Sequence, residues 1–167
     1  MSEENTNKLV CCFVTSRLDY CNSLLAGLPN SKLSRLQQIQ NNAARLVKRI
    51  SKNEHITPIL KELHWLPIPS RINYKILTTV FNCINDTSFP RYLTDSITSY
   101  VPARYLRSRS KHLLVKPRYS LKTYGQRSFF YQAPELWNSL PEDLKNANSS
   151  ESFKKLLKTH LFKEVFY

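Results

Sequence analysis

The sequence predicts a mainly α-helical protein, a compact bundle of short and medium helices that leaves room for a small β-hairpin in a basic segment, residues 100–131. Three observations support this fold class. Apolar residues recur at three- and four-residue spacing in several stretches of the chain. Only 2 glycines but 9 prolines are present, so tight glycine turns are nearly excluded and prolines should begin or end helices. An apolar fraction of 41% over 167 residues is enough to bury a core.

The N-terminal part is expected to form a helical hairpin over residues 8–55, preceded by a disordered stretch over residues 1–7, which are polar and acidic. The first helix should run from residue 8 to about residue 26, because Gly27 and the proline two positions later are helix-stop signals. The second helix is expected over residues 31–50. Its apolar face is formed by Leu33, Leu36, Ile39, Ala43, Leu46 and Ile50.

Residues 56–167 are expected to form a C-terminal helical domain that contains the basic segment. Helices are predicted over residues 56–65, 70–85, 91–97, 133–140 and 150–166, with a further helix start at residues 141–143. Inside the basic segment, residues 112–116 and 121–124 could pair as a hairpin around residues 117–120, although no Asn-Gly turn supports this pairing.

Basic residues are concentrated in two stretches that contain no acid, and the formal net charge is +13. Six bases lie between Tyr20 and Asn53, and eight lie between Ser96 and Pro134. Outside these stretches the chain is about neutral. Charge that is segregated in this way is typical of a surface for a polyanion, nucleic acid first and an anionic membrane face second. We therefore expect RNA and/or DNA as the partner, and no membrane.

The candidate binding residues combine these bases with aromatic rings, because cations attract phosphates and flat rings stack on unpaired bases. The alternatives are an ordinary solvated face on the helix over residues 31–50, and a solvated basic loop whose rings face a small core. The candidate nucleic-acid-binding residues are Lys32, Arg35, Arg45, Arg49, Arg104, Arg107, Arg109, Lys111, Lys116, Arg118, Lys122 and Arg127, and the candidate stacking rings are Tyr105, Tyr119 and Tyr124.

Catalytic, metal-binding and cofactor-binding residues are not expected. A polymerase or nuclease that uses two metal ions needs converging carboxylates, and the neighbouring acids here are limited to residues 3–4 and 142–143. Cys21 and Cys83 lie on apolar helical faces and are expected to be buried, inert thiols, and Asp19 is expected in a structural salt bridge beside Arg17. The chain is therefore not expected to be an enzyme.

The N-terminus does not resemble a secretory signal, and its longest apolar run, residues 9–14, is too short to cross a bilayer. We expect a reduced, intracellular protein of the nucleus or cytoplasm that is not secreted.

Several segments resemble the C-terminal region of the reverse transcriptases of jockey-like LINE (non-LTR) retrotransposons. The first are VTSRLDYCNSLLAGLP (residues 14–29) and LSRLQQIQNNAARLV (33–47), which resemble the segment that follows the catalytic palm. They are followed, in order and with similar spacing, by ITPILKELHWLPIPSRINYKI (56–76), LLVKPR (113–118), TYGQRSF (123–129), APELWNSLP (133–141) and SFKKLLKTHLF (152–162).

The resemblance implies that residues 8–55 are a thumb-like hairpin and that the chain is a remnant of an RNA-directed DNA polymerase. In such a protein the endonuclease and the polymerase carboxylates lie upstream, so no catalytic residue is carried over. The region would grip template RNA or the target-site primer. The polar opening departs from the family's continuous helix, which suggests a truncated element. Two alternatives are a non-functional transposon-derived fragment and a protein-interaction module that uses the amphipathic helix over residues 150–166.

Overall fold

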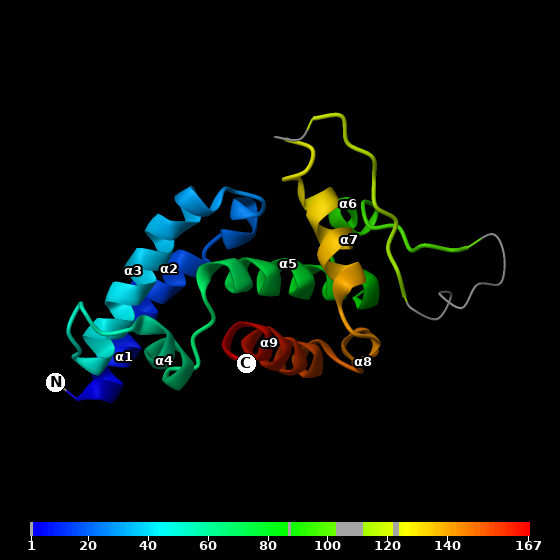
Figure 1. The fold of residues 1–167 in the computed structure, drawn as a ribbon. Helices are drawn as coiled ribbons and strands as arrows, with labels where there is room; N and C mark the ends of the chain where they lie inside the picture. Colours follow the sequence, from blue (N-terminus) through cyan, green and yellow to red (C-terminus); the bar gives the residue numbers. More distant parts are fainter. Residues whose placement is uncertain (1, 87, 103–111, 122–123) are drawn as a thin grey trace. The chain divides into compact units, whose positions relative to one another are not determined.

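The computed structural model describes residues 2–86, 88–102, 112–121 and 124–167 (Figure 1). Within this part the chain is mainly helical, as predicted. It divides into two compact units, of which unit 1 comprises Met1–Ile72 with His160–Tyr167 and unit 2 comprises Asn73–Thr159. The expected boundary at residue 55 therefore lies inside unit 1, because the helix after it packs on the same core as the N-terminal helices.

The N-terminal residues are helical, in contrast to the disorder expected for residues 1–7. Helix α1, Glu3–Val10, is capped by the Ser2 hydroxyl, which accepts a hydrogen bond from the Asn5 N–H. Two acids occupy its first turn, where the helix dipole favours negative charge. Thr6 is buried, so this segment is anchored by packing as well as by its cap.

The single helix expected over residues 8–26 is divided into four pieces. After α1 come a π-helical turn, Cys11–Thr15, helix α2, Ser16–Asp19, and a 3-10 turn, Asn22–Leu25. The chain leaves the helix before the predicted Gly27 stop, because Cys21 adopts a left-handed conformation with φ 50°. A left-handed residue other than glycine is not visible in an apolar pattern.

Unit 1 is built around helix α3, Asn30–Lys48, which contacts α1 and helix α4, Ile56–Glu62. Small residues on one face of α3 let its neighbours approach closely. The buried residues of this core are Val10, Ala43, Ala44, Val47, Ile59, Leu60 and Trp65.

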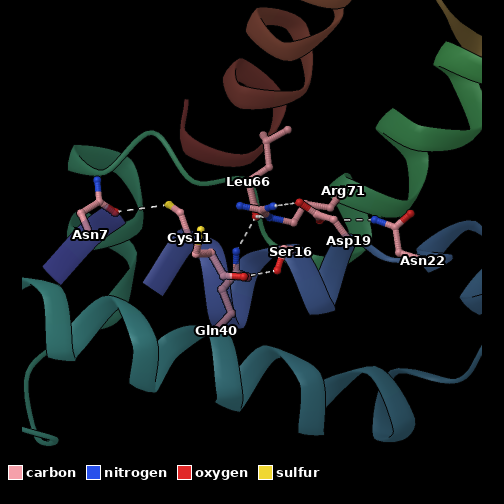
Figure 2. Close-up of polar contacts among 9 residues, drawn as sticks. Asn7, Cys11, Ser16, Asp19, Asn22, Gln40, Leu66 and Arg71 are labelled. Atoms are coloured by element: carbon pink, nitrogen blue, oxygen red, sulfur yellow. Dashed lines mark hydrogen bonds and ion pairs between the residues drawn. The ribbon is translucent and has the colours of Figure 1, made fainter. Parts of the chain in front are cut away.

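A polar network crosses this unit and centres on the carbonyl oxygen of Leu66 (Figure 2). The Gln40 side-chain amide and the Nε of Arg71 both donate to this oxygen, at 2.8 and 2.9 Å. Arg71 also forms an ion pair with Asp19, 2.7 Å between Nη1 and Oδ2. The structural salt bridge expected for Asp19 is thus present, but its partner is Arg71 and not the neighbouring Arg17.

Replacing Gln40 with alanine is expected to lower the free energy of unfolding by about 2 kcal/mol, because a buried side chain and its hydrogen bonds are lost together. Urea denaturation measures this change. Gln38 is the matched control, since it lies exposed on the same helix and its replacement by alanine should change stability by less than about 0.5 kcal/mol. Equal effects of the two substitutions would contradict a structural role for Gln40.

Unit 2 contains the rest of helix α5, Ile68–Asn85, with α6, Arg91–Thr94, α7, Phe129–Ser139, α8, Glu142–Lys145, and most of α9, Ser150–Phe166. Its core is aromatic. Phe153 of α9 stacks on Phe81 of α5 with ring centroids 4.3 Å apart, and it lies 6.0 Å from the Trp137 ring of α7. Apolar residues of α5 and α9 are buried, namely Ile76, Leu77, Val80, Phe81, Phe153, Leu157 and Leu161.

Helix α7 begins four residues before the expected start at residue 133, so that Pro134 lies inside it. Proline is usually confined to a first helical turn because it has no N–H to donate. Here Pro134 is fully buried, and its ring contributes to the core.

The stretch after the undescribed residues 103–111 pairs with the stretch before them. Ser99 and Leu114 form an antiparallel bridge, and the Tyr100 N–H donates to the Leu113 carbonyl at 2.8 Å. Residues 112–116 therefore pair with residues 98–100, and not with residues 121–124 as the hairpin prediction had it; residues 122–123 lie outside the described part. Side chains of α7 hold this stretch, because Trp137 donates to the His112 carbonyl and Asn138 bonds the backbone of Leu114.

Candidate nucleic-acid interface

The predicted binding residues fall into two groups, one in each unit. Unit 1 carries the bases of α3, and unit 2 carries those of residues 112–131. Six of the predicted residues lie outside the described part of the chain, namely Arg104, Tyr105, Arg107, Arg109, Lys111 and Lys122.

The first group lies along the solvent face of α3. Lys32 and Arg35 are exposed in its first turns, and Arg49 is exposed just beyond its end. Arg45 differs, because it is half-buried and its Nη2 donates to the Glu54 carbonyl at 3.3 Å. Arg45 is therefore held against the loop after α3, whereas Lys32, Arg35 and Arg49 of the predicted stripe are exposed.

Acids that are distant in sequence approach the C-terminal half of α3. Lys48 forms ion pairs with Glu3 and Glu62, each at 2.6 Å. Hydrogen bonds to these carboxylates, Glu3 first, hold the pKa of Lys48 above its ordinary value. A stretch without acids in the sequence is therefore not free of acids in space, and no local signal could have indicated this pairing.

The second group surrounds the loop that leads into α7. Arg118 is exposed, whereas Arg127 is half-buried. Lys116 forms an ion pair with Glu135 of α7 at 2.6 Å. Its charge is thus partly balanced, which leaves Arg118 as the better placed of these cations for a phosphate.

The aromatic rings of this loop have different surroundings. Tyr119 meets the edge of Tyr131, with ring centroids 4.7 Å apart and planes at 81°. Burial, and then the neighbouring Tyr119 and Glu135, raise the pKa of Tyr131, so its phenol stays neutral at physiological pH. Tyr124, in contrast, is 79% exposed.

An open hollow of about 380 Å³ lies in this loop. Its charged and aromatic lining residues are Arg118, Tyr119, Tyr124 and Phe130. The sequence analysis did not select Phe130, although two adjacent phenylalanines at a helix start are a signal, since only one of them can face the core. Phe130 is the more exposed ring, at 44%.

Gly125 brings the two sides of this hollow together. Its N–H donates to the Leu121 carbonyl at 2.8 Å. A Cβ at this position would lie 2.6 Å from Cβ of Tyr119 and 2.8 Å from that carbonyl oxygen, distances that real contacts do not reach. The glycine therefore permits the close approach that shapes the hollow.

A second hollow in unit 2, of about 410 Å³, has different chemistry. It is lined by Asn82, Asn85, Asp86 and Ser149, among others. The hydroxyl and the N–H of Ser88 donate to the Asp86 carboxylate and hold its pKa below the ordinary value, so this group is ionised. A phosphate would be repelled there, whereas the described residues that line the hollow beside Arg118 include no acid.

Cys21 and Cys83 differ in burial. Cys83 is half-buried and not fully buried as expected, but this burial raises its pKa to about 11, so it is a neutral thiol. Cys21 is exposed, and the expectation that it is buried is therefore wrong. In residues 2–86, 88–102, 112–121 and 124–167, His, Cys, Asp and Glu side chains do not gather into a group that could hold a metal ion.

None of the helices in the described part of the chain has the length and apolar character needed to cross a membrane. Comparison of the chain with protein-family models, with curated proteins and with solved structures gives no match.

Proposed function

We propose that the chain is a nucleic-acid-binding remnant of the C-terminal region of a LINE reverse transcriptase, without polymerase or endonuclease centres, and that it is not itself an enzyme. It binds RNA and/or DNA in the nucleus or cytoplasm, through one basic surface on each unit. The observation that carries the proposal is the segregation of charge into two acid-free stretches, of which Lys32, Arg35 and Arg118 are exposed.

One observation favours the rival proposal of a transposon-derived fragment without a role. Phe13 is 72% exposed, and Leu9 on the same side of the N-terminal helical segment is also exposed. Apolar side chains in this position lower solubility unless a partner covers them. The other rival, an interaction module built on α9, loses support because Phe153, Leu157 and Leu161 of that helix are buried.

Replacing Lys32, Arg35 and Arg118 with glutamate is expected to weaken binding to a single strand by at least roughly fifty-fold at 0.15 M salt. Three lost phosphate contacts lower the slope of log affinity against log salt by about 2, since each contributes about 0.7 for single strands. Fluorescence anisotropy with labelled single-stranded RNA, single-stranded DNA and duplex DNA over a salt series measures both quantities.

The matched control changes three exposed bases of α9, Lys154, Lys155 and Lys158, to glutamate. This control alters the net charge by the same amount but lies outside the acid-free stretches, so it should change the slope much less. Equal losses in both variants would show that binding depends on net charge alone. Weak binding with a flat salt dependence in the unaltered protein would favour the fragment without a role.

A further inference from the structure

The hollow beside α7 is large enough to admit a flat ligand. Its volume of about 380 Å³ lies near the lower end of the range for small-molecule pockets. The described residues that line it lie between Pro117 and Phe130 and belong to unit 2.

Two rings of the hollow are available to a ligand. Tyr124 is largely exposed and makes no contact with another ring of the described residues. Phe130 touches Phe129 edge-on, with centroids 6.1 Å apart, and keeps a substantial exposed area. Exposed aromatic faces of this kind stack on nucleobases with little dependence on base identity.

Tyr119 has a different part in the same hollow. Its ring is fixed against Tyr131, and its Cβ lies where a side chain on Gly125 would clash. Tyr119 therefore lines the hollow as a ring already engaged with Tyr131, and base stacking is expected on Tyr124 and Phe130.

The charge of the lining residues indicates that the ligand carries a negative charge. Arg118 is exposed at the hollow, and the described lining contains no acid. The nearby Glu135 is paired with Lys116 at 2.6 Å. A flat ring that carries a negative charge on a short linker fits this combination of exposed rings and the exposed guanidinium of Arg118.

We propose that this hollow binds one unpaired nucleobase of a single-stranded nucleic acid, stacked on Tyr124 and Phe130, with an adjoining phosphate at Arg118. The inference rests on the proposed function and adds to it a preference for unpaired bases over duplex. A duplex keeps its bases stacked inside, so the site requires a single strand, a loop or a frayed end.

The experiment compares a normal single-stranded oligonucleotide of about eight nucleotides with an abasic strand that has the same phosphates. The unaltered protein should bind the normal strand about 5- to 150-fold more tightly, which is the contribution expected of one stacked base. Replacing both Tyr124 and Phe130 with alanine should abolish this difference and leave the affinity for the abasic strand unchanged.

Tyr92 provides the matched control, because it is a tyrosine of the same unit and is 72% exposed, but it lies in α6 outside the hollow. Its replacement by alanine should preserve the difference between the two strands, and Tyr124→Phe should preserve it as well. A strand with 2-aminopurine gives a second readout, since its fluorescence should be quenched on binding to the unaltered protein and not on binding to the double variant.

The two proposals fail in different ways. Equal affinity for normal and abasic strands in the unaltered protein would overturn the base-binding site and leave phosphate binding intact. A difference that survives in the double variant would place base recognition elsewhere and overturn this site too. Absence of binding to either strand would overturn both the site and the proposed function.

Discussion

Replacing Trp137 with alanine is expected to lower the free energy of unfolding by about 4 kcal/mol. The side chain is fully buried, it lies against Phe153, and its indole N–H donates to the His112 carbonyl at 2.8 Å. Truncation of a buried tryptophan leaves a large cavity and costs about 3–5 kcal/mol. This is a considerable fraction of the stability of an ordinary domain, about 5–15 kcal/mol.

Urea denaturation followed by far-UV circular dichroism measures the loss, since tryptophan fluorescence of the variant would report only on Trp65, in unit 1. Trp137→Phe separates the contribution of the ring volume from that of the indole hydrogen bond. It retains most of the ring volume but leaves the His112 carbonyl without its donor, so a smaller loss of about 1–3 kcal/mol is expected. A Trp137→Ala variant that unfolds at the same urea concentration as the unaltered protein would contradict this description of the core.

The helices that the sequence predicts well are those whose apolar residues repeat at helical spacing. Helix α9 is the clearest case, because its predicted bounds, 150–166, agree with the structure and its apolar residues Phe153, Leu157 and Leu161 are buried. Leu156 of the same helix is exposed, since the apolar residues of the helix extend beyond the surface that packs on the core. Periodicity thus predicts where a helix lies better than how much of its face is covered.

Contacts between distant residues could not be predicted in the same way. The pairing of residues 98–100 with residues 112–116 depends on Trp137 and Asn138, which follow more than twenty positions later. The early end of the first helix depends on the left-handed Cys21. Neither feature leaves a periodic pattern, and both arise from tertiary packing.

The candidate site was likewise predictable from the sequence only in part. Lys32, Arg35 and Arg118 are exposed, as charged side chains usually are. The withdrawal of Arg45 to the Glu54 carbonyl, the ion pair of Lys116 and the accessible face of Phe130 all depend on elements brought together by folding. Composition therefore predicts which kinds of residue form a surface, whereas the structure shows which individual residues are exposed on it.

The segments that resemble LINE reverse transcriptases contribute the residues on which the two units depend. Asp19, Gln40 and Arg71 of three such segments form the network of unit 1, and Trp137 of a fourth holds the core of unit 2. These four residues therefore stabilise the fold. We expect binding to depend mainly on exposed residues elsewhere in the chain.

Replacing Gly125 with valine is expected to remove the hollow beside α7. The new Cβ would lie 2.6 Å from Cβ of Tyr119 and 2.8 Å from the Leu121 carbonyl oxygen, and neither of these atoms is the far end of a flexible side chain. Forcing extra carbon atoms into such a contact costs about 3 kcal/mol. The loop can relieve this strain only if Tyr119 moves away, and Tyr119 is one of the residues that line the hollow.

The expected result is an affinity for the normal single strand that falls to the level of the abasic strand, together with an unchanged affinity for the abasic strand itself. Arg118 and the bases of α3 remain exposed in this variant, so phosphate binding should persist. Gln126→Val is the matched control, because it introduces the same side chain at the adjacent exposed position. A Gly125→Val protein that still distinguishes the two strands would mean that the bound base lies outside the hollow, since no rearrangement of Tyr119 could then be compatible with the site.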